Sequence, residues 1–476
     1  MSETKKYIQS LFSQNQIPVK PTRTRLFEEF INAEKNILAV NTIKQQQDML
    51  KQNWTIKNKI ADIMDKQIVI PNGNVNKPYE AKIDFIKYGI TGLKYTGFEG
   101  LDKFGLLYNS ETQTLSGTPN ESGDFKLTLQ FRMEEEENDA VLNEKIIALV
   151  INADPKSLWK EIASDLDKDD AWKTANYWKP DRANDFATLG TKNIVAASNR
   201  GRSHANVGSC RDDDYAFAWL EAVGWAVVCV ADGAGSSSVS RQGSKLACGG
   251  VIEYFQNNFT PEMLIAFDLD LKQQYENPNE ASSKRISFFV YDNLSKAALH
   301  AHKKIEDFAL KAERPIKDFH STLIFSLYKK YDFGYALLTF GVGDCPIALL
   351  NKDLSEVKLM NWLDVGEFGG GTRFITMPEI FTSDKFSTRF GFKLIDDFAY
   401  LFMMTDGIYD PKFVVEANLD KIDNWKAFVA DLQGTNEDKA AVDFSGSNTH
   451  IANQLSVWMD FWSPGNHDDR TLAVIF

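Results

Sequence analysis

The chain has 476 residues, of which 43% are hydrophobic and 25% charged, a composition typical of globular proteins with a substantial core. Its 53 basic and 66 acidic side chains give a net charge of −13, and it has no Lys/Arg cluster, which excludes a protein built mainly to hold a nucleic-acid backbone. No apolar run reaches the ~18–20 residues of a membrane span, and residues 1–16 lack the hydrophobic region of a signal peptide. We therefore predict a multi-domain cytoplasmic protein that has neither nucleic acid nor membrane as a partner.

The N-terminal third divides into two predicted parts. Residues 1–66 are rich in Gln, Asn, Lys and Ile, with apolar side chains at roughly helical spacing, which predicts a helical segment. Residues 67–153 show short alternating runs separated by turn residues, which predicts a small β-sandwich. Its clearest strand, FKLTLQF at 125–131, alternates apolar and polar side chains and should bury one face. The stretch LLYNSETQTLSGTPNESGDFKLTLQF at 106–131 resembles the Ig-like repeats of bacterial proteins, which implies a binding or spacing module.

The rest of the chain is predicted to be a connector, residues 154–185, followed by one large domain, residues 186–476. The connector carries three tryptophans and two Xaa-Pro pairs. In the large domain, buried-looking strands alternate with helical stretches, which predicts an α+β fold. The strands are expected at Trp225–Ala231, Tyr335–Phe340, Tyr400–Thr405 and Leu472–Phe476, and the clearest helices at Ser240–Phe255 and Asn293–Leu310. We expect a chain that begins near Asn184 to fold alone. The alternative is that Trp159, Trp172 and Trp178 of the connector pack on the large domain and are needed for its stability.

Acidic residues flank these four strands. Asp232 follows the first strand, Asp344 the second, and Asp406 and Asp410 the third. Asp468 and Asp469 directly precede the fourth strand, and Asp212, Asp213 and Asp214 form a run further upstream. One Asp at a strand end is often only a turn residue, but five such places in one domain indicate a site carried on a rigid sheet. Gathered carboxylates repel one another and need cations. Oxygen ligands with no Cys or His nearby favour Mg²⁺ or Mn²⁺ over zinc.

The order of these motifs resembles the metal-dependent type 2C (PPM) protein serine/threonine phosphatases, in their bacterial branch. The matching stretches are GRSHANVGSCRDD (201–213), VADGAGSSSVSRQGSKLA (230–247), HSTLIFSL (320–327), GVGDCPIALL (341–350), GEFGGGTRFIT (366–376), MMTDGIYDP (403–411) and HDDRTLAVI (467–475). The resemblance covers residues from about 193 to the C-terminus. It implies a four-layer αββα sandwich, in which two antiparallel sheets pack face to face between helices, with a two-metal site at one end.

The resemblance also implies how the residues of this site act. Asp232 would bridge two Mg²⁺ or Mn²⁺ ions, with the Gly233 carbonyl bonding one of them, and Asp406 and Asp468 would complete the shell of the first ion. The family mechanism is attack on phosphorus by a metal-bridging hydroxide, without a covalent phospho-enzyme. The substrates implied are phosphoserine and phosphothreonine in proteins, and a cognate kinase is an implied partner in signalling.

Four further acidic residues match the outer part of the family site. One of Asp212 and Asp213 would serve the second ion, directly or through water, and the run of acids leaves both open. Asp344 and Asp410 match positions that bind a looser third ion in bacterial relatives. The predicted metal set therefore extends beyond the three aspartates expected to act in catalysis.

Two departures from the family pattern keep a second function open. Ala234 stands where many eukaryotic members have a general-acid His, and Val207 and Gly208 stand where many relatives have a phosphate-binding Arg. Arg202 and His204 are the candidates to replace that Arg, since guanidinium and imidazolium groups bond phosphate oxygens. The leading prediction is a metal-dependent phosphoprotein phosphatase. The alternative is a catalytically impaired protein of the same fold that binds phosphoproteins or serves as a scaffold.

Overall fold

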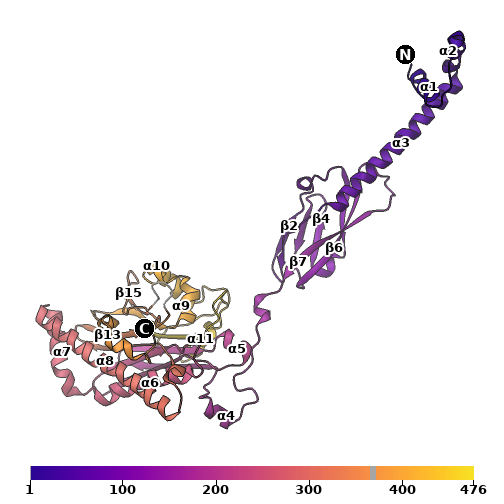
Figure 1. Cartoon of the computed structure of the whole chain (residues 1–476). Coiled ribbons are helices and arrows are strands. Elements are labelled where there is room, and N and C mark those ends of the chain that lie inside the picture. Colours follow the sequence, from indigo (N-terminus) through magenta and orange to yellow (C-terminus); the bar gives the residue numbers. More distant parts are fainter. Residues whose placement is uncertain (1, 365–370) are drawn as a thin grey trace. The chain divides into compact units, whose positions relative to one another are not determined.

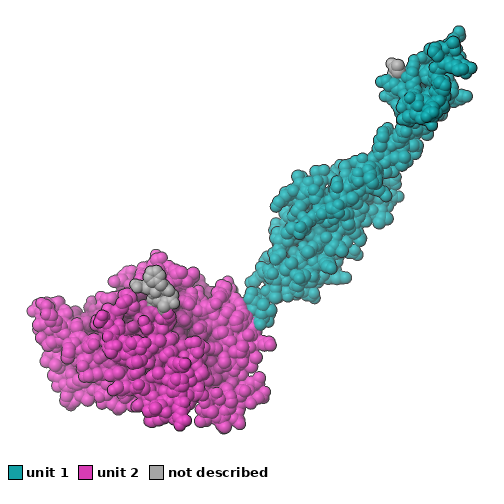
Figure 2. Space-filling view, in the orientation of Figure 1, with its two compact units in different colours: residues 1–158 teal, residues 159–476 magenta. Residues whose placement is uncertain are grey.

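The computed structural model describes residues 2–364 and 371–476 (Figure 1). Residues 366–370 of the predicted motif GEFGGGTRFIT lie outside the described residues. The chain separates into two compact units, unit 1 (residues 1–158) and unit 2 (residues 159–476), which Figure 2 colours separately. Among the described residues, no helix has both the length and the apolar character needed to cross a membrane.

Unit 1 begins with three helices that share a small core. They are α1 (Glu3–Gln14), α2 (Thr24–Asn32) and α3 (Glu34–Asp65), with a 3₁₀ turn η1 (Pro21–Arg23) between the first two. The Ser2 side chain caps α1 by accepting a hydrogen bond from the Lys5 backbone N–H at 3.3 Å. The core consists of the buried side chains Ile8, Phe27, Ile31 and Val40. The predicted N-terminal helical segment is therefore confirmed.

The remainder of unit 1 contains two small sheets around one apolar core. The first has the order β1 (Gly73–Asn74), β7 (Asn143–Asn152), β6 (Gly123–Met133) and β3 (Leu93–Glu99), and the second the order β2 (Tyr79–Lys82), β5 (Thr114–Gly117) and β4 (Leu106–Asn109). The 3₁₀ turns are η2 (Ile86–Tyr88), η3 (Leu101–Phe104) and η4 (Pro155–Leu158). Leu127, Leu129 and Phe131 of β6 are buried in the shared core, so the predicted alternation is confirmed. The Ig-like identity of this module stays a prediction.

Unit 2 is built on two larger sheets. One has the order β10 (Asp214–Leu220), β11 (Trp225–Ala231), β12 (Leu323–Tyr331), β13 (Gly334–Val342) and β16 (Phe390–Ile395). The other has the order β15 (Val357–Leu359), β14 (Ile347–Asn351), β17 (Phe398–Met404), β18 (Arg470–Ile475), β9 (Lys192–Asn199) and β8 (Arg182–Leu189). Their paired strands are antiparallel. Alternate side chains of the two sheets, such as Val228 and Ala473, form a core between them.

Helices cover the outer face of each sheet in unit 2. The first sheet packs its other face, including Trp225 and Cys229, against α6 (Ser240–Asn258), α7 (Pro261–Glu276) and α8 (Glu280–Lys311). The second packs Phe402 and Val474 against α9 (Asp406–Phe413), α10 (Ile422–Leu432) and α11 (Ile451–Trp458). The remaining short elements are α4 (Asp170–Ala175), α5 (Arg202–Val207), η5 (Ile316–Phe319), η6 (Pro378–Thr382), η7 (Phe386–Arg389) and η8 (Glu416–Asn418). This arrangement confirms the predicted αββα fold of the C-terminal region.

Much of the predicted connector belongs to unit 2. The Ile162 backbone N–H donates to the Ala205 carbonyl at 3.0 Å, and the Tyr177 ring packs against Phe308 with centroids 5.5 Å apart. The Trp178 indole N–H donates to the Ser164 hydroxyl at 2.9 Å. Residues 159–181, called the leading segment below, therefore pack within unit 2. The other predicted domain boundaries stay predictions.

Candidate metal centre

The topology of unit 2 gathers the predicted aspartates at one end of the sandwich. In antiparallel neighbours, the end of one strand lies beside the start of the next. Accordingly Ala231, the last residue of β11, pairs with Asp214, the first residue of β10, and Met404 at the end of β17 pairs with Leu472 near the start of β18. We call this end, where β11, β13 and β17 finish and β10, β12 and β18 begin, the site end.

Asp232 is held at the site end by its own backbone. Its N–H donates to the Thr322 hydroxyl at 2.9 Å, and its carbonyl accepts the Thr322 N–H at 2.8 Å and the Ser321 hydroxyl at 2.9 Å. The next residue is Gly233, whose backbone lies so close to the Asp212 carbonyl that a Cβ would collide with it. These contacts fix the Asp232 backbone at the end of β11 and bring the Asp212 backbone beside it.

Asp406 and Asp410 lie one turn apart on α9, so both side chains are on one face of this helix. Gly407 packs directly against the Asp469 carbonyl, and any side chain there would collide with it. This close approach sets the first turn of α9 against the chain that leads into β18. It brings Asp406 to Asp468.

Five aspartates form what we call the carboxylate cluster: Asp213, Asp232, Asp344, Asp406 and Asp468. Burial raises the pKa of Asp232 well above its ordinary value, and the charges of the other four add to this. Burial also raises the pKa of Asp406, and the charges of Asp468, Asp344 and Asp213 add to this. Asp232 therefore lies close enough to each of the other four carboxylates to be repelled by it. The sequence prediction that these residues meet in space agrees with this geometry.

The carboxylate cluster fits a hard divalent cation. Among the described residues, the buried oxygens Asp344 Oδ1 and Asp406 Oδ1 have no hydrogen-bond partner, although the other oxygen of Asp344 accepts the Thr372 hydroxyl at 2.8 Å. Buried, unpartnered and mutually repelling carboxylates need either protons or cations to be stable. Carboxylate oxygens are the ligands that Mg²⁺ and Mn²⁺ prefer.

Cysteine and histidine also lie at the site end, contrary to the sequence prediction. Ligand atoms of Cys345 lie within 4.8 Å of those of Asp232 and Asp344, and the same holds for His204 with Asp468 and Asp469. Burial raises the pKa of the Cys345 thiol well above its ordinary value, and this single thiol stands beside two carboxylates. The oxygen ligands therefore still decide the class of metal.

The structure separates the two acids that the sequence left open. Asp213 is 1% exposed, and its Oδ2 accepts the hydroxyls of Thr405 at 2.8 Å and Thr471 at 2.9 Å. Burial and the charge of Asp469 raise the pKa of Asp213 to about 7. Asp212 instead faces cations, with Arg241 Nη1 at 3.3 Å and His204 Nε2 at 3.8 Å from its two oxygens.

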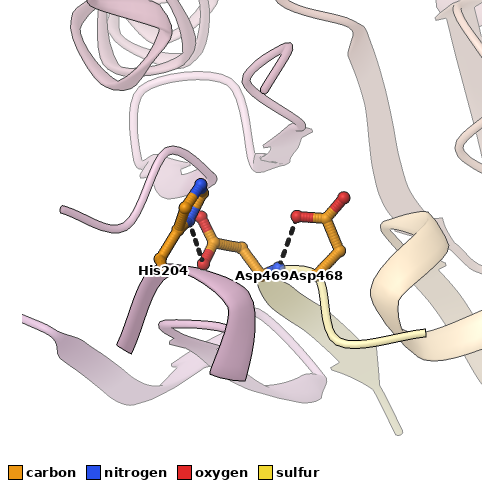
Figure 3. A group of neighbouring side chains, drawn as sticks. All are labelled: His204, Asp468 and Asp469. Atoms are coloured by element: carbon orange, nitrogen blue, oxygen red, sulfur yellow. Dashed lines mark hydrogen bonds and ion pairs between the residues drawn. The ribbon is translucent and has the colours of Figure 1, made fainter. Parts of the chain in front are cut away.

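His204 points at Asp469, as Figure 3 shows, with Nδ1 and Oδ1 3.0 Å apart. Burial alone would lower the pKa of His204, but the hydrogen bond and charge of Asp469 raise it to about 9. Asp469 also accepts the backbone N–H groups of Gly201 and Asp212, both at 2.5 Å. Asp469 thus ties together the chain segments that carry Asp212 and Asp468.

Arg202, a predicted phosphate ligand, donates to the Asp460 carbonyl at 2.8 Å and lies over the Trp462 ring at 5.4 Å. Sequence reasoning missed two other cations at this end, Arg241 and Lys179. Arg241, which was not predicted, is the arginine that pairs with Asp212, and Lys179 bonds the backbone of the same loop. No local motif identifies either residue, because the groups that they contact are distant in the sequence.

Comparison with solved structures returns bacterial phosphatases at low identity. Serine/threonine phosphatase Stp1 from Staphylococcus aureus is 12% identical, with 61% of this chain and 96% of that chain covered and a TM-score of 0.34. The catalytic domain of serine threonine protein phosphatase PstP in complex with 2 manganese ions is 14% identical, with coverages of 62% and 98% and a TM-score of 0.33. The S. agalactiae serine/threonine phosphatase is 13% identical, with coverages of 62% and 99% and a TM-score of 0.34.

Among curated proteins, none matches the chain. The model of one family, described as protein phosphatase 2C, matches residues 200–456, which is more than half of the chain. The matched range includes Asp212, Asp232, Asp344 and Asp406 and stops before Asp468. The chain therefore belongs to the protein phosphatase 2C family.

Proposed function

We propose that this chain hydrolyses phosphoserine and phosphothreonine in proteins with the help of Mg²⁺ or Mn²⁺. The observation that carries the proposal is the carboxylate cluster, which gathers five aspartates from separate strand ends, with repulsion at Asp232 and Asp406 and buried oxygens of Asp344 and Asp406 that have no partner among the described residues. A fold that keeps such an unfavourable arrangement gains a binding site for cations. The membership in the protein phosphatase 2C family supports the reaction class.

We assign the metal-binding roles from the resemblance of these positions to the family pattern. Asp232, with the Gly233 carbonyl, would be shared by two ions; Asp406 and Asp468 would serve the first ion, and Asp213 or Asp212 would serve the second. Asp344 and the exposed Asp410 are candidates for a third ion. When bound, the ions supply an acidic attacking water and neutralise charge on the phosphoryl oxygens, so no covalent phospho-enzyme is required.

The residues of the chain orient these ligands and balance their charge. The hydroxyls of Thr405 and Thr471 fix the Asp213 carboxylate, and Asp469 fixes the Asp212 backbone. Arg241 and His204 place positive charge beside Asp212, where the phosphate of a substrate would approach the cluster. Of the two predicted phosphate ligands, His204 is the better placed, since Arg202 is directed to Asp460. A cytoplasmic location and a cognate kinase stay predictions.

Two observations favour the alternative, a phosphoprotein-binding protein with impaired catalysis. Both oxygens of Asp212 face protein cations, and Ala234 offers no general acid. If Asp213 does not serve the second ion in place of Asp212, this ion would be weakly held. Phosphopeptide binding without turnover would then be the outcome.

Hydrolysis assays with and without metal separate the two functions. We expect the protein to hydrolyse p-nitrophenyl phosphate and phosphoserine or phosphothreonine peptides in the presence of Mn²⁺. Hydrolysis should stop when a chelator is added. Phosphotyrosine peptides serve as the specificity control. Hydrolysis that persists in the chelator would contradict the metal role, and phosphopeptide binding without hydrolysis at any Mn²⁺ concentration would establish the alternative.

A further inference from the structure

Lys179, in the leading segment, is buried beneath the loop that carries Asp212 and Asp213. Its side chain is 7% exposed. The ammonium group contacts five oxygen atoms: the carbonyls of Asp212 at 3.3 Å, of Asp213, and of Arg241 at 3.3 Å, the carboxylate of Asp214 at 3.2 Å and the hydroxyl of Ser244 at 3.2 Å. Three of these five belong to residues 212–214, which with Cys210 and Arg211 we call the acidic loop.

The chemistry of this pocket matches a lysine ammonium group. A lysine ammonium only donates hydrogen bonds, and carbonyls and carboxylates only accept them. The Ser244 hydroxyl uses its own proton on the Asp212 carbonyl at 2.5 Å. A buried cation is costly unless it is paired and hydrogen-bonded, and Asp214 supplies the ion pair. An apolar residue at position 179 would leave the carbonyls of the acidic loop without this donor.

The residues on either side of Lys179 hold it in place. Before it, the Trp178 indole bonds Ser164; after it, the Pro180 carbonyl accepts the Arg211 guanidinium at 3.3 Å. The leading segment also contacts the acidic loop indirectly, through Arg241. The Asn176 carbonyl accepts Arg241 Nε at 2.8 Å, and the same guanidinium pairs with Asp212.

We propose that Lys179 is a positioning residue, which holds the acidic loop so that its carboxylates meet the other members of the metal centre. The role of the loop in metal binding rests on the proposed function. Lys179 lies outside residues 200–456, the part of the chain that matches the family model. The leading segment therefore supports the metal centre from outside the matched region, where Asp468 also lies.

The test compares Lys179→Met with Lys173→Met in the full chain. Both variants remove one positive charge from the leading segment, but Lys173 pairs with Asp165 at 3.0 Å and lies over the Trp178 ring, away from the acidic loop. Hydrogen–deuterium exchange of peptides covering residues 210–216, measured without metal, reports on the loop itself. Calorimetric titration with Mn²⁺ then reports on the metal centre.

We expect Lys179→Met to exchange these amides about tenfold faster and to bind Mn²⁺ about tenfold more weakly, because buried charge-assisted hydrogen bonds are lost. Peptides from β12 and β13 should exchange as in the wild type, and Lys173→Met should match the wild type throughout. A folded Lys179→Met protein with wild-type loop exchange would overturn the proposal. So would equally fast exchange throughout unit 2, since that indicates a general loss of stability.

Two further measurements keep the test decisive. If Lys179→Met does not fold, Asp214→Asn removes only the ion pair, and we expect the same two changes at about threefold. Unchanged loop exchange in folded Asp214→Asn would then overturn the proposal. If the wild type binds Mn²⁺ but hydrolyses no phosphoester, the proposed function fails while both readouts on Lys179 remain valid. If it binds no Mn²⁺, loop exchange alone decides.

Discussion

The two ends of the unit 2 sandwich both carry aspartates in turns, but the surroundings of these aspartates differ. At the opposite end, Asp397 in the turn between β16 and β17 pairs with Lys352 at 2.9 Å and Lys192 at 3.1 Å. Burial alone would raise the pKa of Asp397, but bonds from the two lysines lower it to about 2. At the site end, burial and neighbouring carboxylates raise the pKa of Asp232 and Asp406.

Position in a turn therefore does not by itself identify a metal ligand. Asp232 and Asp397 have the same side chain and similar places beside buried strands. What separates them is the set of charges that the fold brings to each. Asp397 lies beside two lysines, which already neutralise its carboxylate. Asp232 lies beside other carboxylates, so its charge requires a bound cation.

The largest expected effect is on catalysis. Asp232→Asn should lower p-nitrophenyl phosphate hydrolysis roughly a thousandfold or more, because the shared ligand loses its charge. Asp397→Asn removes the same charge from the opposite end and should leave the rate within about twofold. Steady-state kinetics at saturating Mn²⁺ makes the comparison. Comparable losses in the two folded variants would break the distinction between the two ends.

Removal of the leading segment should also have a large effect. A chain that begins at Arg182 keeps all of β8 but loses Lys179 and the Trp178–Ser164 bond, so we expect it to be inactive or insoluble. This reverses the expectation from sequence that a chain beginning near Asn184 folds alone. A chain that begins at Trp159 keeps these contacts and should hydrolyse p-nitrophenyl phosphate at the wild-type rate. Equal activity of both shortened chains would contradict this role of the leading segment.

A smaller effect concerns stability without metal. A carboxyl whose folded pKa is raised binds more protons when folded, so its contribution to stability falls as pH rises above about 4. Asp232→Asn removes this fall and should stabilise the metal-free protein at pH 7 by roughly 1–2 kcal/mol. Urea unfolding in chelator, repeated from pH 4 to pH 8, measures it. Destabilisation that grows with pH would show that Asp232 is not repelled by its neighbours.

Asp397 should behave in the opposite way when the same urea unfolding is extended down to pH 2. Its folded pKa is lowered, so its contribution is present above about pH 4 and is lost as pH falls through about 2. Because the pair is partly exposed, Asp397→Asn should cost only about 0.5–1 kcal/mol at pH 7. A gain in stability from this variant would contradict the ion pair.

The smallest effect is expected at the rim of the site end. Asp410 is exposed, and its Oδ2 accepts only a 3.3 Å hydrogen bond from the Asn466 amide among the described residues. Asp410→Ala should lower activity a few-fold and weaken the response to added Mn²⁺, since one ligand of a loosely held ion is removed. The control is Asp420→Ala, another exposed acid. Loss of all activity in Asp410→Ala would place this residue among the core ligands instead.

The sequence predicts strands better than helix limits. Strand β11 has the predicted bounds, Trp225–Ala231, because a fully buried strand is apolar throughout. Helix α8 starts at Glu280, well before the predicted Asn293, and its early buried residues include Ile286 and Val290. Helix α7 was not predicted, although Thr260 caps it and Leu264, Phe267 and Leu271 mark its buried face.

In the candidate site, the sequence predicts the aspartates better than the cations that support them. The aspartates are recognisable because each stands beside an apolar strand, which is a local signal. Their supporting cations have no such signal: Lys179 contacts Asp214 across 35 residues of sequence, and Arg241 contacts Asp212 across 29. Pairing at this range depends on the fold, so the sequence alone predicts the ligands and misses what holds them.

The most direct test of the metal centre is anomalous diffraction at the manganese edge from crystals grown with Mn²⁺. The account predicts Mn²⁺ at the site end, within about 2.2 Å of oxygens of Asp232, Asp406 and Asp468. It predicts no Mn²⁺ beside Asp397, where Lys192 and Lys352 already neutralise the carboxylate. A site end without manganese at saturating Mn²⁺, or with manganese that does not touch Asp232, would contradict it.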